Sequence, residues 1–223
     1  MGARHEFKHS LNYGDYLVLR SRLAAIMHRD DNADEDGRYQ IRSLYFDTPG
    51  DKALRDKING ADKREKFRLR RYIGHDIINL EKKSKAKGLC YKQAVRLTEA
   101  EVKALLSGGD LFVRDPERAL LQEFYSKVKS QLLRPKTIVE YTREPYICAA
   151  GNVRITFDCA LHTGLYCLDF LNDSAPLVPA GDRNVIMEIK YDRFIPDYIM
   201  KAIGLNARRA EAVSKYALCR VYG

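Results

Sequence analysis

The sequence contains no long hydrophobic run. No segment reaches about 18 consecutive apolar residues, the length that a helix needs to cross a bilayer. The first residues also lack the apolar core and the small-residue cleavage site of a secretory signal peptide. With 45% hydrophobic and 31% charged residues, the composition is typical of a globular protein. We therefore expect no transmembrane helix and a single domain that spans residues 1–223.

Closely spaced cysteine pairs are also missing from the sequence. The five cysteines form no C-x-x-C pair, which argues against a zinc site. Their odd number, in the absence of a secretory signal, favours reduced thiols in a cytosol. We expect a cytoplasmic protein.

Common nucleotide-binding and hydrolase motifs are absent as well. The sequence has neither the P-loop pattern G-x-x-x-x-G-K-[ST] nor the dinucleotide pattern G-x-G-x-x-G, and it has no H-E-x-x-H or G-x-S-x-G. Its five histidines are scattered along the chain. Phosphoryl transfer stays open, because positioning and charge stabilisation can carry most of that reaction without a histidine.

Positive charge, in contrast, is abundant and concentrated. The formal net charge is +9, and residues 63–96 hold twelve Lys or Arg against three acids. Within this stretch Lys66, Arg68 and Arg70 alternate with Phe67 and Leu69, so in a strand the three cations share one face. The flanking cations are expected on the outer surface or in loops, where they should tolerate neutralisation: Arg64, Arg71, Lys82 and Lys87.

Many strands and a few helices are expected along the chain. Alternating polar and apolar residues predict strands at 4–10, 39–47, 63–73, 76–85, 88–97, 136–147, 152–158, 165–171 and 184–192. Helical spacing and capping patterns predict helices at 13–28, 98–106 and 115–132, and a further one from about residue 210. This order indicates an α+β fold, an antiparallel β-barrel tunnel that is closed or nearly closed, with flanking helices.

One parity of these strands collects charged residues. Its members are Glu6, Lys8, Tyr45, Asp47, Lys66, Arg68, Arg70, Glu81, Lys83, Lys85, Lys92, Arg96, Tyr141, Arg143, Arg154, Thr156, Asp158, Glu188 and Lys190. The simplest interpretation is a sheet with one solvated face. The dominance of cations instead suggests a cationic tunnel, which needs anions because like charges at low dielectric repel. Mixed Arg and Lys suit a chain of phosphates, and the few acids suit Mg²⁺ or Mn²⁺.

The same residues form an ordered set of short motifs. In chain order these are Glu6-Phe7-Lys8, Ser43-Leu44-Tyr45-Phe46-Asp47, Phe67-Arg68-Leu69-Arg70, Leu80-Glu81-Lys82-Lys83, Tyr141-Thr142-Arg143, Arg154-Ile155-Thr156-Phe157-Asp158, Met187-Glu188-Ile189-Lys190 and Ser214-Lys215-Tyr216. From about residue 4 to 220 the chain resembles the VTC domain, the polyphosphate polymerase domain of the vacuolar transporter chaperone complex and its bacterial stand-alone relatives. That family belongs to the triphosphate tunnel metalloenzymes. The resemblance implies a β-barrel tunnel that transfers the γ-phosphoryl group of ATP to a growing polyphosphate chain, with Mn²⁺ or Mg²⁺.

The resemblance also implies roles for single residues. The implied phosphate ligands are Lys8, Arg68, Arg70, Lys83, Lys92, Arg143, Arg154 and Lys215, with Arg68, Arg70, Arg143 and Lys215 as the catalytic group. Glu188 matches the metal-binding glutamate, with Glu6, Glu81 and Asp158 as weaker candidates, and Tyr141 and Ser214 match polar groups near the phosphates. Lys85 occupies the place of a histidine in the eukaryotic domain, and Lys66 and Lys190 join the phosphate-binding set through their parity.

One departure favours the polymerase branch. The first strand of the wider superfamily carries the pattern E-x-E-x-K, and Arg4 replaces its first glutamate here. Two rivals stay open: a tripolyphosphatase or nucleoside triphosphatase of the same superfamily, and a non-catalytic module that binds polyphosphate or RNA. Nucleic acid is not expected as a partner, because most Phe residues lie on the opposite parity from the cations. The expected partners are ATP and inorganic polyphosphate, and a separate membrane protein is the route by which membrane association would arise.

Overall fold

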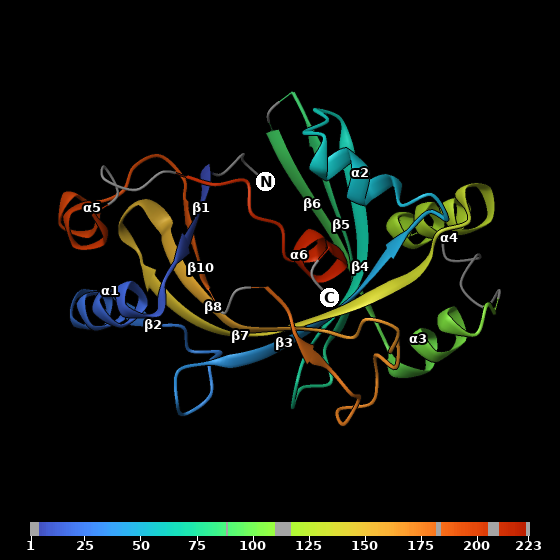
Figure 1. The fold of residues 1–223 in the computed structure, drawn as a ribbon, viewed down its shortest axis with the longest axis horizontal. Coiled ribbons are helices and arrows are strands. Elements are labelled where there is room, and N and C mark those ends of the chain that lie inside the picture. Colours follow the sequence, from blue (N-terminus) through green and yellow to red (C-terminus); the bar gives the residue numbers. More distant parts are fainter. Residues whose placement is uncertain (1–4, 88, 110–116, 182–183, 205–209, 222–223) are drawn as a thin grey trace.

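A ten-stranded antiparallel sheet forms the centre of the molecule (Figure 1). The computed structural model describes residues 5–87, 89–109, 117–181, 184–204 and 210–221. Arg4, residue 88 and the expected helix start at residues 115–116 lie outside these ranges. The strands are β1 (His5–Leu11), β2 (His28–Arg29), β3 (Tyr39–Asp47), β4 (Arg64–Tyr72), β5 (Ile78–Ala86), β6 (Leu89–Leu97), β7 (Arg134–Cys148), β8 (Val153–Thr163), β9 (Val178–Pro179) and β10 (Val185–Tyr191).

The sheet is curled into a half-barrel. Its strands follow the order β1-β10-β8-β7-β3-β4-β5-β6, with β2 beside β7 and β9 beside β8. Among the described residues no pairing joins β1 to β6, so the two edge strands leave one side of the barrel open (Figure 1). The expected α+β barrel architecture with flanking helices is confirmed in this open form.

A short 3-10 helix (Ala150–Asn152) and six α-helices are described in this part of the chain: α1 (Tyr13–Ile26), α2 (Lys52–Ile58), α3 (Glu99–Leu106), α4 (Ala119–Gln131), α5 (Asp197–Ile203) and α6 (Lys215–Val221). Asn12 caps α1 by accepting a hydrogen bond from the backbone N of Asp15 at 2.8 Å. Thr98 and Glu101 form a capping box at the start of α3. None of the helices within the described ranges has the length and apolar character needed to cross a membrane.

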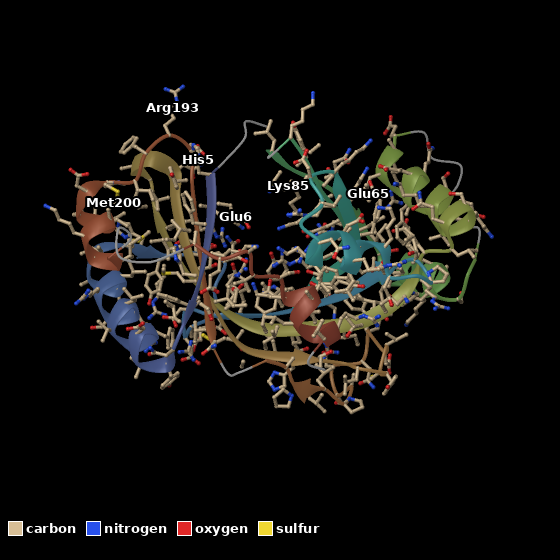
Figure 2. The ribbon with its side chains drawn as sticks, turned by 45° about the horizontal axis from the view of Figure 1, so that its top comes forward. His5, Glu6, Glu65, Lys85, Arg193 and Met200 are labelled. Atoms are coloured by element: carbon tan, nitrogen blue, oxygen red, sulfur yellow. The ribbon has the colours of Figure 1, made fainter. Side chains whose placement is uncertain are left out.

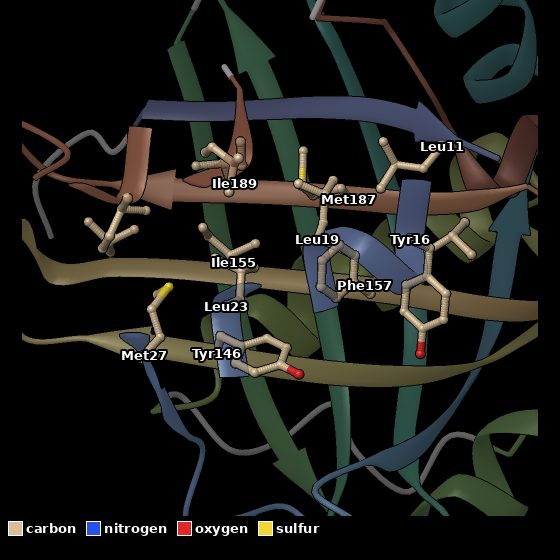
Figure 3. Packing of buried hydrophobic residues seen from close by; sticks show 14 of the residues in the cluster. Leu11, Tyr16, Leu19, Leu23, Met27, Tyr146, Ile155, Phe157, Met187 and Ile189 are labelled. Carbon is tan, nitrogen blue, oxygen red and sulfur yellow. The ribbon is translucent and has the colours of Figure 1, made fainter. Parts of the chain in front are cut away.

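Two apolar clusters hold α1, α3, α4 and α5 to the convex face of the sheet, and a third cluster packs α6 against the concave face. In one cluster, Leu19 and Leu23 of α1 pack on Ile155, Phe157 and other residues of β8 and β10 (Figure 3). In the other, Phe124 of α4 packs on Phe46 and Phe67 of β3 and β4. Because strand side chains alternate between faces, burying one parity on the convex side sends the charged parity to the concave side.

Three local expectations are corrected. Residues 165–171 form turns instead of a strand: Cys167 donates to the carbonyl of Gly164, and Phe170 is buried in the second apolar cluster. The helices α2 and α5 were not expected. Asp47 stabilises the start of α2 by accepting hydrogen bonds from the backbone N of Ala53 and Leu54, at 2.9 and 3.1 Å.

Arg64 is also placed differently from the expectation. It is the first residue of β4 and pairs with Lys85 of β5, and it shares the concave parity of Lys66. It therefore belongs to the cationic face of the sheet. Arg71 and Lys82 have the opposite parity and contact Asp173 and Glu123 respectively, on the convex side.

Candidate functional site

A cationic cavity lies on the concave face of the sheet, and we call it the central groove. It is lined by Lys8 of β1, Tyr45 of β3, Lys66, Arg68 and Arg70 of β4, Lys83 of β5, Tyr141 and Arg143 of β7, Glu188 and Lys190 of β10, and Ser214 and Lys215 at the start of α6. Eight of these residues are cations and one is a carboxylate. The helix α6 lies in the concavity of the sheet, which brings Lys215 to the strands (Figure 1).

Strand register brings these residues together. Lys8 lies directly opposite Glu188 in the β1/β10 pair, and Arg143 lies opposite Asp158 in the β7/β8 pair. Directly opposed residues of antiparallel strands point to the same face. The alternation in the sequence therefore becomes one continuous charged surface.

Glu188 is surrounded by cations. Its carboxylate oxygens lie 3.0 Å from Lys215 Nζ, 3.4 Å from Lys190 Nζ, 3.5 Å from Arg143 Nη2 and 3.6 Å from Lys8 Nζ. Burial opposes ionisation, but the attraction of Lys215, Lys8 and Arg143 is larger and holds the pKa of Glu188 well below its usual range. The group is a carboxylate at neutral pH.

Asp158 supports Arg143 and Lys215 from beneath the groove. Arg143 donates to both of its oxygens, at 2.6 and 2.7 Å, and Lys215 also contacts it. The side chain of Asp158 is fully buried. Burial lowers the pKa of Lys215, but Asp158 and Glu188 more than reverse that effect and raise it. Both cations are thus fixed in position and charged.

Glu81 has the same role on the other wall. Arg68 donates to it through Nε and Nη2, at 2.8 and 2.6 Å, and Lys92 lies 2.6 Å from its second oxygen. Arg68 also donates to the hydroxyl of Tyr45 at 2.8 Å, and Arg70 donates to the hydroxyl of Tyr141 at 3.0 Å. Arg68 is therefore held by Glu81 and Tyr45, while Arg70 has one hydrogen bond, to Tyr141, and lies 3.8 Å from Glu81.

Lys66 and Lys83 differ from the other groove cations. They lie directly opposite each other in the β4/β5 pair, and among the described residues neither has a carboxylate within salt-bridge distance. The ammonium of Lys66 lies 5.5 Å from the ring centre of Tyr45. Burial and the neighbouring cations Lys8 and Arg68 lower the pKa of Lys66 to about 7. Burial and Arg68 likewise lower the pKa of Lys83 well below its usual range.

Comparison with known proteins identifies the family. The sequence profile of the VTC domain matches residues 3–221, nearly the whole chain, as the motif order predicts. The chain belongs to the VTC domain family. No curated protein sequence matches it.

Solved structures share the fold of this VTC domain. The protein HpAC1 from Hippeastrum, whose description reports a dominant triphosphatase activity, has a TM-score of 0.57 at 13% identity, covering 99% of this chain and 96% of its own. A proposed adenylate cyclase from Bacillus halodurans has a TM-score of 0.55 at 15% identity, covering 93% of this chain and 94% of its own. A proposed adenylate cyclase from Vibrio parahaemolyticus has a TM-score of 0.52 at 13% identity and covers 98% of both chains. At these identities the likeness establishes the tunnel fold alone.

Six of the residues expected at the site of this VTC domain lie outside the groove cavity: the carboxylates Glu6, Glu81 and Asp158, and the cations Arg154, Lys92 and Lys85. Arg154 donates to the hydroxyl of Tyr39 at 2.6 Å and pairs with Asp30 at 2.7 Å. Lys92 lies on the exposed edge strand β6 and contacts Glu81. Lys85 lies on β5 two residues beyond the lining residue Lys83, opposite Cys90. The other eleven expected residues that line the cavity are Lys8, Lys66, Arg68, Arg70, Lys83, Tyr141, Arg143, Glu188, Lys190, Ser214 and Lys215.

One lining residue, Tyr45, was not among the expected site residues. Its hydroxyl accepts from Arg68, and its ring stacks on Tyr216 of α6 with ring centres 4.9 Å apart. The sequence did carry a signal for it, because Tyr45 has the same parity as the cations of the neighbouring strand.

The carboxylates of this site can hold a divalent cation only together with a ligand. The described residues contain no cluster of three or more His, Cys, Asp or Glu that could enclose a metal ion. Glu188 and Glu6 lie near each other, since Lys8 contacts both, at 3.6 and 3.0 Å. Burial raises the pKa of Glu6, but Lys8 and Lys190 outweigh it and lower the pKa to about 2. Such a donor set fits Mg²⁺ or Mn²⁺ bound by one or two carboxylates and completed by phosphate oxygens and water.

The two remaining metal candidates are occupied by cations. Glu81 contacts Arg68, Arg70 and Lys92, while Asp158 contacts Arg143 and Lys215. These contacts make both carboxylates counter-ions of the phosphate-binding side chains.

Proposed function

We propose that this VTC domain is a polyphosphate polymerase that transfers the γ-phosphoryl group of ATP to an inorganic polyphosphate chain in the central groove. The observation that carries the proposal is the lining of the groove: eight cations and one carboxylate, in a chain whose sequence matches the VTC domain from end to end. Two of those cations, Lys66 and Lys83, have no carboxylate within salt-bridge distance among the described residues. A chain of phosphates supplies the missing negative charge.

The catalytic group in this proposal is Arg68, Arg70, Arg143 and Lys215. A terminal oxygen of the polyphosphate chain attacks the γ-phosphorus of ATP, the bond to the β–γ bridging oxygen breaks, and ADP leaves with that oxygen. No protein nucleophile is required. Arginines that are already held by Glu81 and Asp158 need little reorganisation when charge moves to the leaving oxygen, which is the condition for strong electrostatic stabilisation.

The other lining residues position the two phosphate chains. Lys8, Lys66, Lys83 and Lys190 present ammonium groups, and Tyr141 and Ser214 present hydroxyls. Glu188, with Glu6 beside it, would hold a divalent cation on the phosphate oxygens. A bound Mg²⁺ or Mn²⁺ supplies Lewis-acid charge at these oxygens and neutralises the repulsion between donor and acceptor.

A synthesis assay tests the proposal. The purified chain is incubated with ATP, Mn²⁺ and a short polyphosphate primer, and ADP, free phosphate and polymer length are measured separately. ADP formation in step with polymer growth is expected, and Arg70→Ala should lower the rate at least about a hundredfold because it removes a fixed charge from the transferring group. If a folded Arg70→Ala protein synthesised polymer at the wild-type rate, the assignment of the reaction to the central groove would be wrong.

A triphosphatase is the second candidate. HpAC1, whose description reports a dominant triphosphatase activity, has the same fold along nearly its whole length. The same cations would then bind the triphosphate while water takes the place of the polyphosphate acceptor. Free phosphate as the only product from ATP or tripolyphosphate, without polymer growth at any primer concentration, would establish this alternative.

A further inference from the structure

The concave cations of β4 and β5 are arranged in a ladder that is longer than the central groove. Four directly opposed pairs follow one another with concave parity: Arg70 with Asn79, Arg68 with Glu81, Lys66 with Lys83, and Arg64 with Lys85. At about 3.3 Å per residue, the ladder extends over roughly 20 Å. A triphosphate is too short to contact all four pairs.

The outermost pair lies outside the groove lining, and within the described part of the chain no carboxylate pairs with it. Arg64 and Lys85 are both half-buried, and Arg64 donates through Nη1 to the carbonyl of Ala61 at 2.5 Å. Among the described residues neither side chain has a carboxylate within salt-bridge distance. Like charges directly opposite each other across two strands repel, and an anion bound between them would relieve that repulsion.

A third cation, Lys57 of α2, lies near the outermost pair. Lys57, in the last turn of α2, donates to the carbonyl of Ala212 at 2.7 Å. The neighbouring Glu211 donates its backbone N to the carbonyl of Lys8 at 2.8 Å, so residues 210–214 link β1 to α2 across the concave side. Burial, followed by repulsion from Arg64, Lys8 and Lys85, lowers the pKa of Lys57, which places these cations within electrostatic reach of one another.

The outermost pair is at the open side of the half-barrel. In Figure 2, Lys85 on β5 and Glu6 on β1 lie on the two walls that face each other across this opening. The ladder therefore leads from the fixed arginines in the groove, past Lys66 and Lys83, to the rim.

We propose that Lys57, Arg64 and Lys85 form a rim subsite that binds phosphate groups of an inorganic polyphosphate chain beyond the segment held in the central groove. The inference rests on the proposed function, because the chain that reaches the rim is the polymer bound in the groove. The rim subsite should make the protein prefer longer chains: it contributes to the binding of long polyphosphate and contributes nothing to the binding of tripolyphosphate.

Binding measurements with two inorganic probes test the subsite. Tripolyphosphate and long-chain polyphosphate are titrated into the wild-type chain, Lys57→Gln, Arg64→Gln and the double variant Arg64→Gln/Lys85→Gln. Each single variant should lose about three- to fivefold in affinity for the long chain, and the double variant roughly tenfold, since half-exposed charge contacts are individually modest. Affinity for tripolyphosphate should stay within about twofold of the wild type by the same reasoning.

A matched control separates the rim from a general charge effect. Lys103→Gln removes one positive charge from the exposed face of α3, where Lys103 pairs with Glu99, and should leave both affinities unchanged. The dependence of long-chain affinity on salt should become shallower in the rim variants alone, because fewer cations are neutralised on binding. Thermal unfolding checks that each variant is folded, and removal of a repelling cation should not lower the midpoint.

The outcomes separate this inference from the proposed function. Equal losses for tripolyphosphate and the long chain, or no loss for either, would overturn the rim subsite while the groove remains. A wild-type chain that binds neither probe would overturn the groove and the rim together. A loss confined to the long chain supports the rim subsite whether the groove proves to synthesise or to hydrolyse.

Discussion

The two halves of the cationic surface differ in how their charge is balanced. In the inner half, Arg68 is paired with Glu81, and Arg143 and Lys215 are paired with Asp158. In the outer half, Lys66 and Lys83 face each other, followed by Arg64 and Lys85, and no carboxylate pairs with these four among the described residues. The β4/β5 ladder thus passes from one ion pair, Arg68 with Glu81, to two pairs of like charge.

The inner cations are therefore fixed by carboxylates of the protein, whereas the outer cations would be paired only when an anionic ligand binds. A buried cation that is paired and hydrogen-bonded keeps its position and its proton, which suits stabilisation of a transferring phosphoryl group. An unpaired cation repels its neighbours until an anion arrives, so its contribution appears only in the bound state. The inner half is accordingly suited to catalysis and the outer half to capture of a polyanion.

Removal of an inner carboxylate should have the largest effect on stability. Asp158→Asn leaves Arg143 and Lys215 buried with one fewer counter-charge, and loss of one partner from a buried ion pair costs about 3–5 kcal/mol. Chemical denaturation measures this loss. Saturating tripolyphosphate should restore part of it, because the ligand replaces the missing negative charge. Unchanged stability in Asp158→Asn would show that the inner half is not held together by its carboxylates.

The outer half should make ligand binding depend on pH. The pKa of Lys66 is about 7 in the free protein because of burial and of Lys8 and Arg68, and a bound phosphate raises it. Binding therefore takes up a proton above pH 7, and affinity for tripolyphosphate should fall by up to about tenfold per pH unit as the pH rises further. Titrations from pH 6 to 9 measure the slope. Lys66→Met should flatten it, and an identical slope in Lys66→Met would assign the dependence to another group.

The dependence of folding stability on pH should have opposite signs for Lys66 of the outer half and for Glu6 of β1. Lys66 binds its proton less tightly in the folded state than in the unfolded state, so its destabilising effect disappears as the pH rises from about 7 toward the ordinary lysine value. Glu6 has a folded pKa of about 2, below its ordinary value of 4.5, because Lys8 and Lys190 outweigh its burial. Its stabilising contribution is complete above that ordinary value and is lost as the pH falls toward 2.

The sequence predicts the charged face better than the balance of its charges. Strand alternation placed Lys66, Arg68 and Arg70 on one face, because the two-residue period depends on the backbone alone. Whether Glu81 binds a metal or an arginine depends on which residues of β4 and β6 lie opposite it, and that register follows from the folded sheet. Parity could not distinguish a counter-ion from a ligand.

The sequence patterns also did not predict how residues near strand ends pair, nor where the two shortest unexpected helices begin. Arg154 has the concave parity but lies near the start of β8, where Tyr39 and Asp30 bind it instead of the groove. The helices α2 and α5 have seven residues each, too short for a helical apolar period to stand out. Pro196 gives α5 no capping side chain, and Asp51, although a favoured N-cap residue type, makes no capping hydrogen bond to α2. The caps of α1 and α3 gave a start signal, and both helices begin where it predicts.

Loss of a single hydroxyl in the inner half should have a smaller effect than loss of a carboxylate. Tyr45→Phe keeps the ring that stacks on Tyr216 and removes only the oxygen that accepts from Arg68. The expected cost is about 1 kcal/mol of folding stability, with a roughly fivefold lower rate of phosphoryl transfer, because Arg68 retains Glu81 as its main partner. Steady-state kinetics should place the loss in kcat, since a looser Arg68 acts on the transition state. A change confined to KM would mean that Tyr45 contacts the substrate directly.

The smallest expected effect has the opposite sign and belongs to the outer half. Lys83→Met removes one of two directly opposed cations and keeps an unbranched apolar chain of similar length. In phosphate-free buffer, folding stability should rise by up to about 1 kcal/mol, since the variant relieves repulsion and breaks no ion pair. The same variant should bind tripolyphosphate roughly tenfold more weakly, because Lys83 lines the groove and no other side chain replaces its ammonium group.

Lys215→Met is the matched comparison for Lys83→Met. It also removes a lysine of the groove lining, but Lys215 is paired with Asp158 and Glu188, so its loss should lower stability and affinity together. If Lys83→Met lowered stability as Lys215→Met does, Lys83 would have a counter-ion in solution, and the contrast between the two halves would not hold.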